Sequence, residues 1–284
     1  MSRLLAAVLL LAVGVTLADA ARAQAPAQGP ALPTNVDDLL ARSRDVMADG
    51  MVGSGIVHAL YAETARALID SFAIESGLPA ARAVDELAAW LMLPEDRADP
   101  RFVRLAEAVQ VWQLLDRGAA AAGAPMPYWA ARGFDRARYE STMCVVWGRG
   151  PGVYRTLARR AGLPADAQAR CVETYQQVDA RWLRVLEPYA APDDAMRPGR
   201  MAMTVDWQVL ALGGPVRALR ESAMLEMVAD QITASFNLTA ELTLRVEPCA
   251  EPTIAWRPDE RAIVLCEGLV AAIDRLIRPA FVNP

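Results

Sequence analysis

The sequence predicts an α+β fold that is predominantly α-helical and contains a small β-sheet. Apolar residues recur at helical spacing through most of the first two-thirds of the chain. The last third contains short stretches that are typical of strands, such as "ELTLRVE" and "RAIVLC". No repeat of solenoid type is present in the 284 residues. We therefore expect a single domain over residues 36–284, with a helical part at 36–190 and a strand-containing part at 200–284.

The first 23 residues have the features of a signal peptide. Arg3 supplies a positive charge, "LLAAVLLLAVGVTLA" is an apolar run, and "ADAARAQA" offers cleavage after Ala20 or, preferably, Ala23. The run is short for a bilayer span, so an uncleaved membrane anchor is the weaker alternative. Residues 24–35 are rich in Pro, Ala and Gln and predict a flexible lead-in. We expect a periplasmic or secreted protein without a stable membrane span after cleavage.

Helices are expected throughout the part before residue 190. Apolar spacing favours a helix that begins at Ile56 and includes "LYAETARALID", and the glycines of "GMVGSG" are expected to separate it from a short helix at Asn35–Ala48. Further helices are predicted at Ala80–Leu93, Phe102–Arg117, Phe134–Trp147 and Val153–Ala161, and in one long segment after Pro164. "GAAAAGAPMPYW" is predicted to be a loop and "APDDAMRPG" a linker.

The strand-containing part begins with "MAMTVDWQVLAL", whose alternation suggests a strand. One helix is expected over Pro215–Phe236. "LTAELTLRVEPC" and "RAIVLC" follow as short strands, and "RPDE" is predicted to be a turn between two extended pieces. A helix at Gly268–Leu276 closes the predicted fold.

The four cysteines are Cys144, Cys171, Cys249 and Cys266. In an exported protein an even number of cysteines favours disulfides, and three pairings are possible. We prefer the near-neighbour pairing, Cys144 with Cys171 and Cys249 with Cys266, because each bridge then stays within one half of the chain. A zinc site is less favoured, since no two cysteines have the close spacing of a zinc knuckle.

Charge and loop composition exclude some function classes. The net charge of −5 argues against a nucleic-acid partner, which would favour a basic stripe. "GRGPG" follows a predicted helix rather than a strand and contains proline, so it indicates a turn rather than a phosphate-binding loop.

The segment "LYAETARALID" places Glu63, Arg66 and Asp70 within two turns of one helix. Zinc peptidases often carry two histidines four residues apart on a helix, with a glutamate after the first histidine that activates the metal-bound water. Here Ala62 and Arg66 stand at the two histidine positions around Glu63. Arginine stays protonated and offers only donors, so it would repel a dication. The spacing instead predicts a ladder of ion pairs from Glu63 through Arg66 to Asp70.

Other possible metal ligands are few. His58 is the only histidine in the chain and lies one turn before Ala62 on the same helical face. A lone histidine there is more often a packed or surface residue than a ligand. Asp85 and Glu86 on the next predicted helix could add carboxylates, although a solvated helix face explains them as well.

Several segments, in this order, resemble a bacterial family of exported candidate zinc metallopeptidases, which is defined as a domain of unknown function with an H-E-x-x-H helix. They are "IVHALYAETARALID", "GLPAARAVDELAAW", "MPYWAARGFDRARYESTMCVVWGRGP", "LPADAQARCVETYQQVDARWLRVLEPY" and "CAEPTIAWRPDERAIVLCEGL". The resemblance covers roughly Gly53 to Leu276. It implies a zincin-like metallopeptidase scaffold, in which Glu63 matches the general base of the motif.

The departures from the family pattern decide the expected function. Ala62 and Arg66 replace both histidines, and Ala89 or Trp90 replaces a later acidic residue. A general base without its metal-bound water has nothing to activate. We therefore expect a degenerate member without a metal cofactor, in which Glu63 is vestigial.

The function expected of such a member is a binding or structural role in the cell envelope, with a peptide or an envelope protein as partner. The alternative is an active zinc metallopeptidase, hydrolysing peptide bonds, with a non-standard ligand set of His58, Glu63 and either Asp85 or Glu86.

Overall fold

A computed structural model describes residues 36–94, 99–122, 136–192, 201–209 and 213–282. The predicted signal peptide and lead-in lie outside these residues. Contacts divide the chain into Met1–Leu39 and Leu40–Pro284, and every helix and strand beyond the first residues of α1 belongs to the second unit. None of the helices in the described residues combines the length and the hydropathy needed to cross a membrane.

Six helices occupy the described residues before β1, and the observed boundaries are close to those predicted except at the break expected within α1 and at the end of α3. Their bounds are α1 Val36–Ser71, α2 Ala80–Leu91, α3 Pro100–Ala122, α4 Arg136–Arg149, α5 Pro151–Arg160 and α6 Ala165–Leu186, followed by a 3-10 turn at Glu187–Tyr189. Pro79, Gly150 and Pro164 stand at the N-caps of α2, α5 and α6, so the turn residues of the sequence do set these boundaries.

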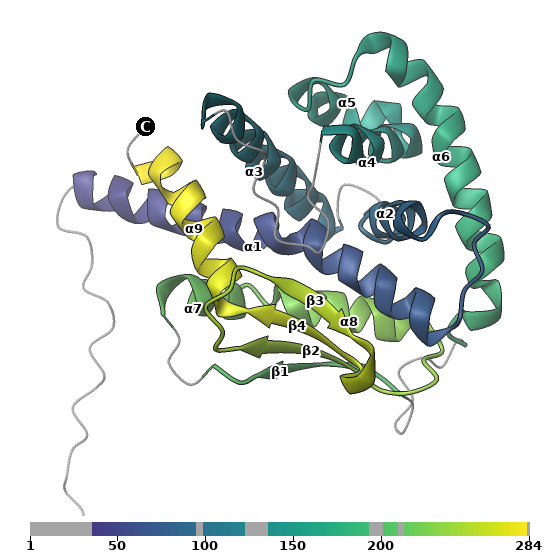
Figure 1. Ribbon diagram of the computed structural model, residues 1–284. Coiled ribbons are helices and arrows are strands. Elements are labelled where there is room, and N and C mark those ends of the chain that lie inside the picture. Colours follow the sequence, from purple (N-terminus) through teal and green to yellow (C-terminus); the bar gives the residue numbers. More distant parts are fainter. Residues whose placement is uncertain (1–35, 95–98, 123–135, 193–200, 210–212, 283–284) are drawn as a thin grey trace, which may run out of the picture. The chain divides into compact units, whose positions relative to one another are not determined.

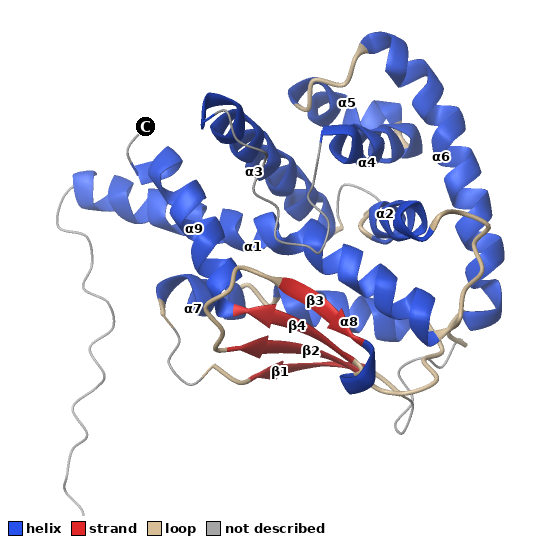
Figure 2. Cartoon of the chain, viewed as in Figure 1, coloured by secondary structure: helices blue, strands red, loops and turns tan. Residues whose placement is uncertain are grey.

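A four-stranded mixed sheet lies in the C-terminal part, which confirms the predicted α+β class (Figures 1 and 2). The strands are β1 Met203–Trp207, β2 Leu242–Glu247, β3 Ile254–Arg257 and β4 Ala262–Cys266, in the order β1-β2-β4-β3. β1 and β2 are parallel, as are β2 and β4, whereas β3 runs antiparallel to β4 at one edge. The turn predicted at "RPDE" is the 3-10 turn Pro258–Glu260 between β3 and β4.

The helices form two sets, one that contacts the sheet and one that packs together after α1. α8 (Met224–Ser235) packs against β1, and α9 (Glu267–Val282) contacts β4, α7 (Gly214–Glu221) and α3. α4 packs along α6, and α2 contacts both. β3, the edge strand, is the strand that α1 runs beside in Figure 1, which places the motif helix next to an unpaired sheet edge.

The predicted separation of two N-terminal helices is wrong, because α1 continues without a break through Gly50, Gly53 and Gly55. Gly53 and Gly55 allow neighbouring side chains to approach the helix closely. A Cβ on Gly55 would lie 3.0 Å from Ile273 of α9, and one on Gly53 would lie 3.1 Å from Met224 of α8. Packing of α1 against the later helices therefore outweighs the low helix propensity of glycine.

Two further expectations are corrected. The helix predicted over Pro215–Phe236 is two helices, α7 and α8, because Ala223 adopts a left-handed conformation with φ of 51° between them. The predicted loop "GAAAAGAPMPYW" begins as helix, since α3 extends to Ala122. The rest of that segment, and most of the predicted linker "APDDAMRPG", lie outside the described residues.

Both disulfides of the preferred pairing are present. Cys144–Cys171 joins α4 to α6, and Cys249–Cys266 joins the segment after β2 to the end of β4. The second bridge closes a loop that contains all of β3, Ile254–Arg257. A disulfide lowers the conformational entropy of the unfolded chain, because it holds the two ends of a loop together. Each of these bridges therefore favours the folded state.

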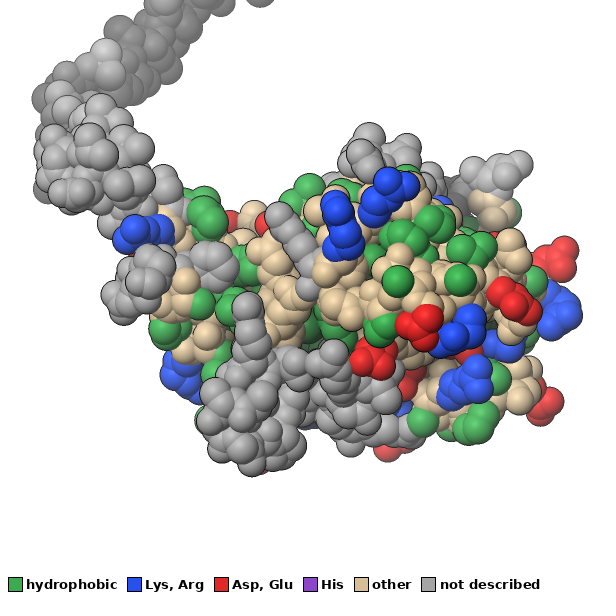
Figure 3. Space-filling model, turned by 90° about the horizontal axis from the view of Figure 1, so that it is seen from above, with side chains coloured by type: hydrophobic (Ala, Val, Ile, Leu, Met, Phe, Trp, Pro, Cys, Tyr) green, Lys and Arg blue, Asp and Glu red, His purple; other side chains and the backbone are tan. Residues whose placement is uncertain are grey.

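The surface is mixed in charge on the side that Figure 3 shows. Basic and acidic side chains lie among one another there, with apolar side chains between them. No histidine is visible on this face, in keeping with the 1% exposure of His58.

Candidate functional site

Glu63 is buried, with 1% of its surface exposed, and its carboxylate binds the edge of the sheet. Oε2 accepts the backbone N–H of Trp256 at 2.9 Å and the Nε–H of Arg66 at 3.1 Å. Oε1 is buried without a hydrogen-bond partner among the described residues. The side chain at the general-base position of the motif therefore connects α1 to β3.

Trp256 is held from α1 at a second point. Its indole Nε1–H donates to Asp70 at 2.9 Å, and Asp70 lies two turns after Glu63, on the same face of the helix. An edge strand leaves outward N–H groups without a neighbouring strand, and a buried N–H without an acceptor destabilises the fold. Glu63 supplies that acceptor for Trp256, and the negative charge strengthens the hydrogen bond.

The predicted ion-pair ladder is correct in its first half and wrong in its second. Arg66, whose side chain is 28% exposed, pairs with Glu63. Among the described residues Arg66 makes no ion pair with Asp70, which binds Trp256 instead. The ladder was expected on a helix surface, but approach of β3 buries Glu63 and gives Asp70 a different partner.

The residues at the two predicted motif positions, Ala62 and Arg66, differ in environment. Ala62 is 2% exposed and packs within the hydrophobic core. Arg66 reaches solvent while its Nε–H remains on Glu63. One ligand position is thus filled by a methyl group in the core, and the other by a cation that neutralises the glutamate between them.

His58 lies in the core beside Trp112. Their ring centroids are 5.3 Å apart and the rings are nearly perpendicular, at 89°. Burial, together with the positive charge of Arg138, lowers the pKa of His58 from its usual 6.5 to about 3. The imidazole is therefore neutral at physiological pH, and it is a packed residue.

Asp85 and Glu86 each bind arginine. Asp85 accepts from both Nε, at 3.0 Å, and Nη2 of Arg138, which joins α2 to α4. Glu86, 7% exposed, accepts from Arg181 of α6 and from Arg82 at 3.3 Å. The solvated helix face that could explain both residues is therefore wrong for Glu86, whose burial is compensated by two guanidinium groups.

These side chains do not converge on a zinc site. Catalytic zinc takes three protein ligands with one position left for water. Within the described ranges no group of three His, Cys, Asp or Glu side chains is placed to hold a metal ion. Each of the three carboxylates considered in the sequence binds a guanidinium group. Glu63 of α1 binds Arg66 of the same helix. On α2, Asp85 binds Arg138 of α4 and Glu86 binds Arg181 of α6. The residues present do not fit the zinc ion that the motif would imply.

Sequence reasoning missed the partners of Glu63, Asp85 and Glu86. Trp256 follows Glu63 by 193 residues, and Arg181 follows Glu86 by 95. In the sequence, Trp256 stands out only as part of the segment "CAEPTIAW" that resembles the family. No local pattern links it to α1, because pairing between distant segments depends on the tertiary fold.

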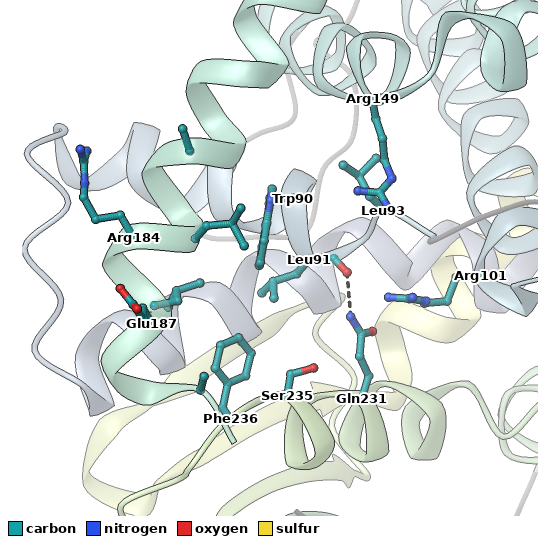
Figure 4. Close-up of a pocket in the computed structure, with 14 residues that line it drawn as sticks. Trp90, Leu91, Leu93, Arg101, Arg149, Arg184, Glu187, Gln231, Ser235 and Phe236 are labelled. Atoms are coloured by element: carbon teal, nitrogen blue, oxygen red, sulfur yellow. Dashed lines mark hydrogen bonds between the residues drawn. The ribbon is translucent and has the colours of Figure 1, made fainter. Parts of the chain in front are cut away.

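A pocket of about 820 Å³ lies between α2, α6 and α8, and Figure 4 shows its lining. Glu63 is not part of this lining. Tyr61 of α1 donates its hydroxyl to Gln231 at 2.5 Å, and Gln231 in turn donates to the carbonyl of Leu91 at 2.8 Å. The pocket therefore lies near α1, but the residues that line it are not those of the motif.

Comparison with known proteins identifies a family for just over half of the chain. No curated protein and no solved structure matches it. A family model described as "Putative metallopeptidase" matches residues 40–186, which include the motif helix, the carboxylates of α2 and the first disulfide. The match agrees with the resemblance found in the sequence. The chain belongs to this metallopeptidase family.

Proposed function

We propose that this family member is an exported pseudo-peptidase, which keeps a zincin-like scaffold without zinc chemistry and has a binding or structural role in the cell envelope. The observation that carries the proposal is the state of Glu63. Its Oε2 is hydrogen-bonded to the backbone of Trp256 and paired with Arg66. This carboxylate acts as a structural bridge.

The chemistry of a zinc peptidase explains why this matters. There the glutamate takes a proton from a water that the metal has acidified. In this chain the metal positions hold Ala62 and Arg66, and the guanidinium group of Arg66 forms an ion pair with Glu63 at 3.1 Å.

Export to the periplasm or the exterior is supported by two kinds of observation. The N-terminal sequence has signal-peptide features. All four cysteines form disulfides, which persist in oxidising compartments. Such a location would place a binding or structural role in the cell envelope or outside the cell.

Metal analysis of the mature protein, purified without a metal-affinity tag, tests the proposal. We expect no stoichiometric zinc and no hydrolysis of a mixed peptide library after zinc is added. One equivalent of tightly bound zinc would contradict it and would favour the alternative ligand set of His58, Glu63 and Asp85 or Glu86.

A further inference from the structure

The pocket between α2, α6 and α8 has the size and composition of a small-ligand site. Its volume of about 820 Å³ is within the range in which small organic ligands bind. Trp90, Leu91, Leu186 and Phe236 give it apolar walls. Leu183 also lines it and is 56% exposed, which is a large exposure for a leucine. A ligand with an apolar body would cover this side chain.

The walls are cross-linked by hydrogen bonds. The indole Nε1–H of Trp90 donates to Asp179 of α6 at 2.8 Å, and Gln231 of α8 donates to the carbonyl of Leu91 at 2.8 Å (Figure 4). These bonds join α2 to both other helices of the pocket. A pocket formed in advance binds more tightly, because less order is lost when the ligand enters.

The charged lining residues are three arginines and one glutamate, in a chain whose net charge is −5. Arg101 and Arg149 lie at one end of the pocket, whereas Arg184 and Glu187 lie at the other (Figure 4). Arg101 forms an ion pair with Asp99, in which Nη2 of the arginine lies 2.5 Å from Oδ2 of the carboxylate.

Arg149 is a candidate for contact with an anion. It donates to the hydroxyl of Tyr175 at 2.9 Å, which fixes the direction of the guanidinium group. Arg149 and Arg101 both oppose the rise in the pKa of Tyr154 that burial causes, whereas the charge of Asp99 adds to that rise. Among the residues that line the pocket, the charged side chains at this end are the two arginines, whereas the other end combines opposite charges, Arg184 and Glu187 (Figure 4).

We propose that this pocket binds a small amphipathic carboxylate, with the carboxylate at Arg149 and the apolar body between Trp90, Leu183 and Phe236. A fatty acid and the C-terminal end of an apolar peptide both have this chemistry. The inference deepens the binding role proposed above and rests on it. The pocket does not include Glu63. A ligand titration can therefore contradict the pocket proposal while the zinc analysis still supports the pseudo-peptidase proposal, and the reverse can also occur.

Calorimetric titration of the mature protein with three probes tests the proposal. The probes are decanoate, N-acetyl-Ala-Phe with a free carboxyl group, and the same dipeptide amidated. We expect saturable 1:1 binding of decanoate, of the free dipeptide or of both, and the probe that binds identifies the source of the ligand. The amide should bind about tenfold or more weakly than the free dipeptide if the peptide is the ligand, because it cannot form the charge-assisted bond.

Matched variants locate the site. Arg149→Gln keeps a donor for Tyr175 but removes the charge, and should weaken binding about tenfold or more. Arg184→Gln removes a charge at the opposite end and should change affinity less than about threefold. Leu183→Asp should abolish binding, whereas Leu276→Asp, at an exposed leucine of α9, should leave it unchanged. Both leucines are exposed, so neither aspartate needs to be buried.

Two results would overturn the proposal. One is the absence of saturable binding for both decanoate and the free dipeptide. The other is binding that Arg149→Gln and Leu183→Asp leave unchanged, since the ligand would then occupy another place.

Discussion

The carboxylate of Glu63 accepts the backbone N–H of Trp256 at 2.9 Å, so the general-base position of a peptidase motif is part of the contact between α1 and an edge strand. Arg66 compensates the charge, and Asp70 holds the indole of the same tryptophan. Each of these three side chains therefore makes a contact that helps to hold β3 or to compensate the buried charge. This arrangement gives Glu63 a structural role on the helix where Ala62 and Arg66 stand beside it.

Replacement of Glu63 should therefore lower stability. Glu63→Ala leaves the N–H of Trp256 buried without an acceptor, and we expect the free energy of unfolding to fall by about 2–3 kcal/mol. Glu63→Gln keeps an acceptor and should cost about 1 kcal/mol. Urea unfolding measures both changes.

The exposed Glu75 offers a matched control for that series. Glu75→Ala should change the free energy of unfolding by less than about 0.5 kcal/mol, as is usual at the surface. If Glu63→Ala were as stable as Glu75→Ala, the hydrogen bond to Trp256 would have no structural importance.

Burial of His58 predicts a pH dependence of stability. The folded pKa is about 3 and the unfolded pKa about 6.5, so between these values the unfolded chain binds one more proton. The contribution of neutral His58 to the free energy of unfolding is fully present above pH 6.5. It falls as the pH is lowered towards 3, with a slope that approaches about 1.4 kcal/mol per pH unit.

His58→Phe separates this contribution from that of the carboxylates, because phenylalanine keeps an aromatic ring beside Trp112 but does not titrate. The free energy of unfolding of the variant should depend less steeply on pH between 6.5 and 3 than that of the wild type. Equal slopes in the two proteins would mean that His58 is protonated in the folded state.

The two disulfides should affect different segments. Their cysteines are 27 and 17 residues apart, and replacement of either pair by serine should cost about 3 kcal/mol. Only loss of Cys249–Cys266 should speed hydrogen exchange of the amides at Ile254–Arg257, because this bridge closes the loop that carries β3. Faster exchange there after loss of Cys144–Cys171 alone would contradict the assignment.

Ala223 gives a prediction with opposite signs at two alanines. Its φ of 51° is unfavourable for a side chain with a Cβ, so Ala223→Gly should raise stability by about 0.5–1 kcal/mol. Ala169 is exposed within α6, and Ala169→Gly should lower stability by about 1 kcal/mol. Thermal unfolding of both variants measures the difference. A loss of stability in both would show that the break between α7 and α8 is not strained.

Elements whose ends carry turn residues could be predicted from the sequence. Pro79 and Pro164 begin α2 and α6, and the near-neighbour pairing of the cysteines is correct. Gly53 and Gly55 were misleading, because local propensity predicts a break where contacts with α8 and α9 require small residues.

The candidate site was less predictable than the fold. Glu63 and Arg66 lie three residues apart, and their ion pair follows from helical geometry. The bond from Trp256 to Glu63 and the pair between Arg138 and Asp85 join distant segments, which a single sequence does not align. The same holds for the pocket, whose walls come from helices that are far apart in the chain.

Zinc titration of the wild type beside Ala62→His/Arg66→His tests the central claim most directly. The double variant restores two imidazoles on one helical face around Glu63. We predict that calorimetry finds no stoichiometric zinc binding by the wild-type protein and a gain of zinc binding by the variant. Tight binding of one zinc by the wild type would contradict the claim that Glu63 is a structural remnant of a lost metal site.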